Sequence, residues 1–291
     1  MASLIDIRRR LRSLKNTQQI TRAMKMVSAA RLRRAQDRAI AARPYAKLLR
    51  EVLASVSARV TEAKHPLLAA RDEKRVVLLI VAGDRGLAGA FNANVQRSAA
   101  LLLAEKKGWE SVTILPIGKK AVDYWRRRAR AITEKTYPGI FARIEYAHAR
   151  EIADFLTAEF AEDRADAVYV VANEFKSVIA QTIRVEKILP IERGKTGVTE
   201  ASGERPADFI YEPDPETILA RLLPRYLEFI IFRVLLESSA AEHAARMTAM
   251  DSASRNAGDL IDSLTLTYNR ARQARITKEL IEIVSGSAAA Q

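Results

Sequence analysis

Apolar residues recur in alternating steps of three and four along the first sixty residues, which is the pattern of a coiled-coil seam. The positions in this pattern are Leu4, Ile7, Leu11, Leu14, Gln18, Thr21, Lys25, Ser28, Leu32, Ala35, Ala39, Ala42, Ala46, Leu49, Leu53, Val56 and Val60. The seam is polar between positions 18 and 28, where the apolar residues shift to Ile20, Met24 and Val27. The sequence therefore predicts one long helix whose buried stripe changes position in that region.

The end of the chain carries a second seam of the same kind. Asp214, Pro215 and Glu216 form a typical helix start, because Asp caps, Pro suits the first helical position and an acid is favoured by the helix dipole. The steps of three and four then recur at Met247, Met250, Ser254, Ala257, Ile261, Leu264, Tyr268 and Ala271. We expect this helix to end at Gly286. The two seams can bury each other as an antiparallel pair.

The segment between the two seams alternates between strand and helix patterns. We expect strands at 75–82, 112–117, 167–171 and 178–189, and helices at 91–107, 119–130 and 148–161. Residues 194–207 are rich in Gly, Thr and Ser, which indicates an exposed linker. The predicted fold class is α/β plus long helices, an antiparallel coiled coil of N- and C-terminal helices with a central Rossmann-like open α/β domain. The expected parts are 1–60, 61–210 and 211–291.

Positive charge is concentrated in the first helix. Residues 1–50 hold 14 of the 48 Lys and Arg residues but only two acids, Asp6 and Asp37, in a chain of net charge +13. Like charges along one helix repel each other, so a partner of opposite charge is a better explanation than a bare solvated surface. Charge alone does not distinguish nucleic acid, an anionic membrane and an acidic protein surface.

Candidate catalytic and cofactor motifs are weak throughout the sequence. Residues 83–89 (GDRGLAG) space their glycines as G-x-x-G-x-x-G rather than G-x-G-x-x-G, so we interpret them as a structural turn, with a nucleotide-binding enzyme as the less favoured alternative. Residues 194–196 (GKT) resemble the end of a P-loop, but the leading glycine is replaced by Leu189. The expectation is a chain without catalytic residues or cofactors.

Neither a metal site nor a membrane-spanning segment is expected. His65, His148 and His243 stand apart from one another in the sequence, and there is no cysteine. No apolar run approaches the roughly 20 residues needed to cross a bilayer. The N-terminus lacks the apolar core of a signal peptide, so we interpret it as mature sequence.

Three stretches closely resemble the F-type ATP synthase gamma subunit family. They are residues 16–30 (NTQQITRAMKMVSAA), 83–92 (GDRGLAGAFN) and 245–286 (from ARMTAMDSASRNAGDL to ARITKELIEIVSG). Together with ARPY at 42–45 and YEPDP at 211–215, the resemblance covers essentially the whole chain in collinear order. The architecture of that family agrees with the one that the periodicities predict.

The resemblance implies a non-catalytic rotor shaft, present once per complex. Its coiled coil would enter a ring of three alpha and three beta subunits, while the α/β domain holds the epsilon subunit and rests on the membrane ring of c subunits. Rotation of that c ring, driven by protons, would then be coupled to ATP synthesis at the beta-subunit catalytic sites. The protein would be peripheral on the cytoplasmic face of the bacterial inner membrane, attached only through the c ring. A nucleic-acid-binding basic coiled coil is the alternative function.

The resemblance also implies contact residues. The beta-subunit contacts would be Arg8, Arg9, Met24, Lys25, Arg246, Arg272, Gln273 and Thr277, and the c-ring contacts would be Phe209 and Glu212. For Arg246, Arg272, Gln273 and Thr277 the alternative is ordinary exposed helix surface, and Arg8 and Arg9 could equally be free. Ala88 departs from the Cys that is common in the family. The absence of cysteine excludes the two-cysteine regulatory insert of chloroplast forms.

Overall fold

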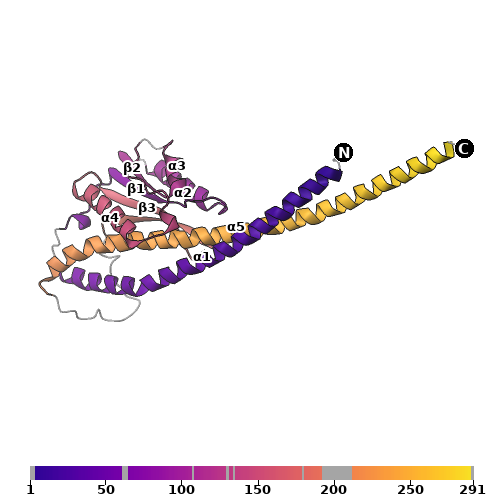
Figure 1. Ribbon diagram of the computed structural model, residues 1–291. Helices are drawn as coiled ribbons and strands as arrows, with labels where there is room; N and C mark the ends of the chain where they lie inside the picture. The colour runs from indigo at the N-terminus through magenta and orange to yellow at the C-terminus, as the bar shows by residue number, and fades with distance from the viewer. Residues whose placement is uncertain are drawn as a thin grey trace. The chain divides into compact units, whose positions relative to one another are not determined.

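The structure is a computed structural model that describes residues 4–60, 65–106, 108–128, 131–133, 135–178, 180–191 and 212–289. The chain forms two compact units, one made of residues 1–29 and 246–291 and the other of residues 30–245. The two long helices, α1 (Leu4–Arg59) and α5 (Pro215–Ala289), each contribute residues to both units (Figure 1). The predicted division into parts 1–60, 61–210 and 211–291 does not correspond to these units and stays a prediction. The linker at 194–207 lies outside the described residues.

The smaller unit is an antiparallel pair formed by the first part of α1 and the last part of α5. Arg8 contacts Tyr268, Gln18 contacts Ser254, and Lys25 contacts Asp251. The residue numbers on α5 decrease as those on α1 increase, so the two helices run antiparallel. The predicted seam of α5 is buried at Met250, Ser254 and Ala257, and is half-buried at Ile261, Leu264, Tyr268 and Ala271. The antiparallel pairing of this region is confirmed.

The predicted shift of the α1 stripe is wrong. Thr21 and Ser28 stay buried at 7% and 3% exposure, whereas Ile20 and Val27 are 60% and 53% exposed. Hydrogen bonds satisfy two of the polar residues here: the Thr21 hydroxyl donates to the Gln18 carbonyl at 3.0 Å, and the Gln18 amide donates to the Ser254 carbonyl at 3.4 Å. The steps of three and four therefore continue through the polar region, where Ile20 and Val27 face outward and Met24 is half-buried.

The start of α5 agrees with the sequence, but its end does not. The Asp214 carboxylate accepts hydrogen bonds from the backbone N–H of Thr217 at 2.8 Å and from its hydroxyl at 2.7 Å, and the helix begins at Pro215. The helix runs to Ala289, past the predicted stop at Gly286. Glycine ends a helix only where the backbone leaves the right-handed conformation, and inside a helix it costs only about 1 kcal/mol.

The larger unit is built on a four-stranded sheet with the order β2-β1-β3-β4. Strand β1 (Arg75–Val81) pairs in parallel with β2 (Ser111–Ile117) and with β3 (Ala167–Phe175), while β4 (Gln181–Leu189) is antiparallel to β3. The remaining elements are the helices α2 (Phe91–Glu105), α3 (Lys119–Trp125) and α4 (Tyr146–Ala161), with short 3-10 turns η1 (Pro66–Leu68) and η2 (Ile140–Ala142). The predicted open α/β sheet is confirmed, with an antiparallel edge strand.

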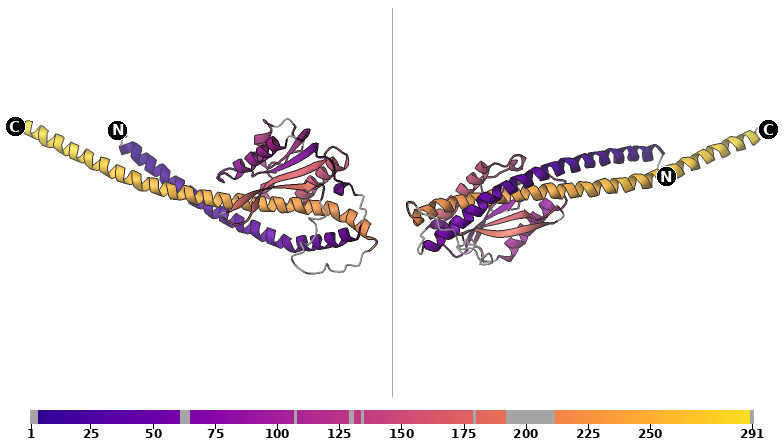
Figure 2. Two further views of the ribbon diagram at one scale, coloured as in Figure 1. Left: turned by 180° about the vertical axis from the view of Figure 1, so that it is seen from behind. Right: turned by 90° about the horizontal axis from the view of Figure 1, so that it is seen from below.

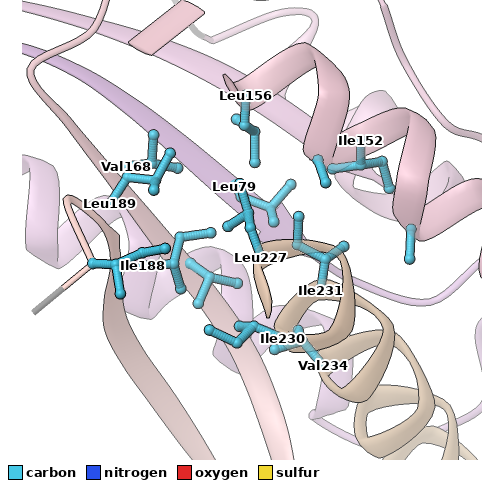
Figure 3. Packing of buried hydrophobic residues seen from close by; sticks show 14 of the residues in the cluster. Leu79, Ile152, Leu156, Val168, Ile188, Leu189, Leu227, Ile230, Ile231 and Val234 are labelled. Atoms are coloured by element: carbon cyan, nitrogen blue, oxygen red, sulfur yellow. The ribbon is translucent and has the colours of Figure 1, made fainter. Parts of the chain in front are cut away.

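Alternate residues of β1 face two different layers. Leu78 and Ile80 pack with α2 and α3, whereas Val77, Leu79 and Val81 pack with α4 and with the long helices. Figure 3 shows the second layer, in which Leu79 lies between Ile152 of α4 and Leu227 of α5. The part of α1 in this unit joins the same core through Leu53 and Val56. The sheet is therefore covered on both faces, as its nearly continuous apolar strands require.

Strand β3 and helix α3 differ most in length from their predicted ranges. Strand β3 extends to Phe175 because its last residues pair with β4, from Asn173↔Ile183 to Phe175↔Gln181. Residues 173–175 (NEF) lack the continuous apolar run by which the strand was predicted, so the sequence did not indicate this pairing. Helix α3 ends at Trp125, whose ring is buried and whose Nε1 donates a hydrogen bond to Gln96 of α2. Residues 126–128, all arginine, form a turn rather than more helix, and residues 129 and 130 of the predicted range lie outside the described residues.

Replacing Asp166 by asparagine should destabilise the larger unit. The Asp166 carboxylate is 5% exposed and accepts hydrogen bonds from the Arg75 side chain at 2.6 Å and from the Arg75 backbone N–H at 2.7 Å. We expect Asp166→Asn to lower the free energy of unfolding at pH 7 by about 2 kcal/mol, since the negative charge is lost and the amide nitrogen cannot accept the bonds that one carboxylate oxygen receives now. Urea unfolding measures this, with the exposed Asp72→Asn as the control.

The same pair predicts a pH dependence. The Arg75 side chain holds the pKa of Asp166 below its ordinary value. A carboxyl group whose pKa is depressed by folding contributes stability above the pKa of the unfolded chain, and that stability is lost as the pH falls through the folded pKa. The difference between the wild type and Asp166→Asn should therefore shrink below about pH 4. A difference that does not change with pH would contradict the ion pair.

Candidate interaction surfaces

The residues predicted to contact beta subunits fall into three groups by their surroundings. Arg9, Arg272, Gln273 and Thr277 are exposed, Met24 is half-buried, and Arg246 is buried at 6% exposure. Arg8 and Lys25 have partners on α5, which are described below. Of the two predicted c-ring residues, Glu212 is exposed and Phe209 lies outside the described residues.

Lys25 is engaged within the helix pair. Its ammonium lies 2.5 Å from the Asp251 carboxylate, and Arg255 approaches the other oxygen of Asp251 at 3.4 Å. The hydrogen bond from Lys25 lowers the pKa of Asp251. The Lys25 side chain remains 45% exposed, so an outside partner would meet this lysine together with Asp251 and Arg255 rather than as an isolated charge.

The Lys25–Asp251 pair can be tested by titration. We expect the pKa of Asp251, followed by NMR of its carboxyl carbon, to lie below its ordinary value and to rise in Lys25→Met. Arg255→Met should raise it less, because Arg255 is the more distant partner. Since the pKa is depressed in the folded chain, the pair stabilises the helices above the ordinary carboxyl pKa and loses its effect at lower pH. An unchanged pKa in Lys25→Met would show that the pair does not form in solution.

Arg8 is also engaged, whereas its neighbour Arg9 is exposed. The Arg8 guanidinium donates to the Tyr268 hydroxyl at 2.9 Å and lies 5.8 Å from the centre of the Tyr268 ring. Such a contact contributes about 0.5–1 kcal/mol at an exposed site. Arg8 therefore helps to join the two helices, and Arg9 is the better candidate for an outside contact.

The last part of α5 carries an apolar stripe that sequence reasoning missed. All side chains from residue 272 to residue 285 are exposed, including Ile276, Leu280 and Ile283. Figures 1 and 2 show this part of α5 continuing past the described start of α1. The spacing of four and three among these three residues is the available signal, since it continues the pattern of a helix face that seeks a partner.

The exposed side of α1 in the same unit combines apolar and basic residues. Ile20, Met26 and Val27 are all more than half exposed. The basic residues exposed on this part of α1 are Arg8, Arg9, Arg10, Arg12, Lys15 and Arg22. A surface that mixes large apolar side chains with arginine is typical of protein interfaces.

Side chains of residues 83–92 form hydrogen bonds with the backbone in and around this segment. The Gly83 N–H donates to the Asn92 side chain at 2.8 Å, and the Asn92 amide donates to the Arg85 carbonyl at 3.1 Å. The Asp84 carboxylate accepts from the backbone N–H groups of Lys119, Gly139 and Phe141 at 2.7–2.9 Å. A phosphate would need N–H groups such as these, so the arrangement favours the structural turn.

Close packing against α5 explains why residue 83 is a glycine. A Cβ at this residue would lie 2.7 Å from the Glu242 carboxyl carbon, and Glu242 is buried at 3% exposure. The glycine thus allows α5 to pass close to the end of β1. A buried carboxylate at this point also disfavours a phosphate.

Neither a metal-binding cluster nor a membrane-spanning helix is found in the part of the chain that the structure describes. No cluster of three or more His, Asp or Glu side chains with the geometry to hold a metal occurs among those residues. None of the helices described has an apolar stretch long enough to span a bilayer.

Comparison with known proteins gives matches along the whole chain. A family model described as ATP synthase matches residues 3–290. The ATP synthase gamma chain of Solibacter usitatus (strain Ellin6076) is 52% identical over 100% of both chains. That of Chlorobaculum parvum (strain DSM 263 / NCIMB 8327) is 49% identical over 99% of this chain and 98% of the relative.

Solved structures are similar as well. The central stalk and c-ring structure of Tetrahymena thermophila mitochondrial ATP synthase contains a chain with a TM-score of 0.62 and 25% identity, covering 81% of this chain and 99% of that chain. A chain of Euglena gracilis mitochondrial ATP synthase, in rotational state 3, has a TM-score of 0.67 and 19% identity over 98% of this chain and 94% of that chain, which shows the fold alone.

Proposed function

Because the chain belongs to the family of ATP synthase gamma chains, we propose that it is the central rotor shaft of an F-type ATP synthase. In this role it couples proton-driven rotation of the c ring to ATP synthesis at the catalytic sites of the beta subunits. The observation that carries the proposal is the full-length match to gamma chains, joined to the antiparallel pairing of α1 with α5.

The helix pair has physical properties that suit a rotating shaft. Two helices with a continuous seam resist bending more than one helix does, and the seam here holds from Arg8 and Tyr268 to Lys25 and Asp251. A shaft also needs contacts that are weak and can change, because a tight bond to one surrounding subunit would stop rotation. Long-range attraction between exposed arginines and acidic loops meets this requirement.

We propose that the contacts with the beta subunits are made by the exposed parts of the helix pair. Arg9 and Met24 with Lys25 lie on α1, and Arg272, Gln273 and Thr277 lie on the exposed part of α5. Arg8 and Arg246 are included from the resemblance, although Arg8 bonds to Tyr268 and Arg246 is buried. Glu212, with Phe209, is the proposed contact with the c ring.

The rest of the assembly follows from the same proposal. One copy of the chain joins three alpha and three beta subunits, the epsilon subunit and the c ring. The chain supplies no catalytic residue, and its place is peripheral, on the cytoplasmic face of the bacterial inner membrane. The apolar stripe at Ile276, Leu280 and Ile283 supports insertion of the end of α5 into a protein cavity, because an exposed stripe of this kind is stabilised by burial.

The decisive experiment reconstitutes the chain with alpha and beta subunits and follows its rotation. The chain has no cysteine, so Arg126→Cys on the exposed side beyond α3 takes a single probe. ATP should drive rotation of the probe in one direction, and ATPase activity should require the chain. Copurification without ATP-driven motion would refute the shaft role. Tight, salt-sensitive DNA binding by a chain that does not assemble would favour the nucleic-acid alternative instead.

A further inference from the structure

A pocket in the larger unit lies where α1, α4 and α5 meet. It is a hollow of about 410 Å³ lined by Tyr45, Tyr146, Arg150, Arg225 and Glu228. This volume falls within the range of roughly 300–1,000 Å³ that is typical of binding pockets. None of these five residues belongs to the proposed beta-subunit or c-ring contacts.

The two tyrosines form fixed walls of the pocket. The Tyr45 ring packs against Phe229 with ring centres 5.5 Å apart, and the Tyr146 ring packs edge-on against Phe232 at 5.4 Å. Both aromatic partners lie on α5, so the walls are held by the same helix that supplies Arg225. Both tyrosines are nevertheless partly open to solvent, at 48% and 38% exposure. Aromatic side chains that are already held in place lose little entropy when a partner binds.

The two arginines supply positive charge that the single carboxylate of the pocket, on Glu228, offsets only in part. Arg150 and Arg225 are exposed, and neither guanidinium has an ion-pair partner among the described residues. Glu228 is engaged by a hydrogen bond with the Tyr146 side chain. Burial first, and the Glu228 carboxylate second, raise the pKa of Tyr146, so its phenol keeps its proton and donates to Glu228.

We propose that this pocket receives an acidic side chain, Asp or Glu, from another protein subunit of the complex. The guanidinium groups of Arg150 and Arg225 would bind its carboxylate, and the rings of Tyr45 and Tyr146 would cover its backbone and neighbouring atoms. Tyrosine and arginine are the residue types that most often dominate the binding energy of protein interfaces. The inference rests on the proposed place of the chain in the synthase.

An anionic membrane is the less suitable occupant. Surface binding to acidic lipids typically uses clusters of about four to eight Lys and Arg residues, each contributing about 1 kcal/mol. This pocket has two arginines, and a carboxylate lies beside them. A concave site with aromatic walls fits a protruding side chain better than a flat surface.

The test uses the complete purified complex. Tyr45 is replaced by a photoreactive phenylalanine analogue, the complex is irradiated, and the linked peptides are identified by mass spectrometry. We expect a link to a peptide of another subunit that contains Asp or Glu. The yield should fall at least tenfold when Arg150→Glu and Arg225→Glu are combined, but not in Arg97→Glu, an exposed arginine on α2. In the complex that carries Arg150→Glu and Arg225→Glu, replacing the linked acid of the other subunit by lysine should restore the link. A folding defect in the double variant would not be corrected by that change.

Several outcomes overturn the inference. Links confined to this chain, or a yield that is insensitive to the two charge reversals, would show that no acidic residue is held there. Loss of the link in inorganic phosphate but not in chloride at equal ionic strength would identify a phosphate site. Binding of the isolated chain to phosphatidylglycerol vesicles through Arg150 and Arg225 would identify a lipid. If the complex forms without the Tyr45 link, only the pocket inference fails, whereas absence of assembly removes the proposed function as well.

Discussion

Replacing Gly118 by alanine should lower the free energy of unfolding of the larger unit by about 4 kcal/mol. Gly118 has φ +86° and stands between β2 and α3, where a Cβ would lie 2.0 Å from the Ala82 carbonyl oxygen and 3.1 Å from the Phe141 ring. The oxygen belongs to the backbone just after β1, in the centre of the sheet, so it cannot move away without disturbing the strand. Both the disfavoured dihedral and the clash therefore act against folding.

Thermal unfolding followed by near-ultraviolet circular dichroism measures this effect. A loss of this size in a unit of about 200 residues corresponds to a fall in Tm of roughly 10 °C. Gly86→Ala is the matched control, because no atom lies within 4 Å of the place its Cβ would take. Equal Tm values for Gly118→Ala and Gly86→Ala would mean that the junction of β2 and α3 is not built as described.

Replacing Asp84 by alanine should cost about 3 kcal/mol of unfolding free energy, because three hydrogen bonds to a charged acceptor are lost together. The Asp84 carboxylate joins the end of β1 to the first residue of α3 and to the turn at Gly139 and Phe141. Each of these backbone N–H groups would lose its acceptor at once. The estimate stays below the sum for three buried bonds because Asp84 is partly exposed to water.

The asparagine variant separates the two oxygens of Asp84. Its remaining carbonyl oxygen can still accept from Lys119 and Gly139, as Oδ1 does now, but its amide group would face the Phe141 N–H without accepting from it. Asp84→Asn should therefore lie between the wild type and Asp84→Ala in urea unfolding. Asp123→Ala, an exposed acid on α3, is the control and should change stability by less than about 0.5 kcal/mol. A loss in Asp123→Ala as large as that in Asp84→Ala would contradict this explanation.

The arrangement of helices and strands was predictable because burial imposes a period on the sequence. The seam from Met250 to Ala271 and the continuous apolar run of β1 both follow directly from that rule. The rule failed at Ile20 and Val27, which are more hydrophobic than Thr21 and Ser28 but are exposed while those two residues are buried. The small size of Thr21 and Ser28, and the hydrogen bond of the Thr21 hydroxyl, allow these residues to be buried between the helices. A pattern of hydrophobic residues does not include either property.

Contacts between distant segments were less predictable. Periodicity gives the face of each helix but not which residue on α1 stands opposite which residue on α5, so the Lys25–Asp251 pair could not be derived. The role of Asp84 depends on three backbone groups far along the chain, and the pocket at Tyr45 depends on three separate helices. The beta-subunit and c-ring residues rest on resemblance and stay proposals.

The exposed end of α5 has a thermodynamic consequence. Between residues 272 and 285 no side chain is covered, and an unsupported helix of about this length is marginal in water even when its residues favour helix. Backbone amides near Leu280 should therefore exchange with deuterium far faster than those near Ser254, where the partner helix excludes solvent. Under the proposed function, enclosure of Ile276, Leu280 and Ile283 by a partner subunit would slow this exchange, so the assembled complex should protect amides that the isolated chain exposes.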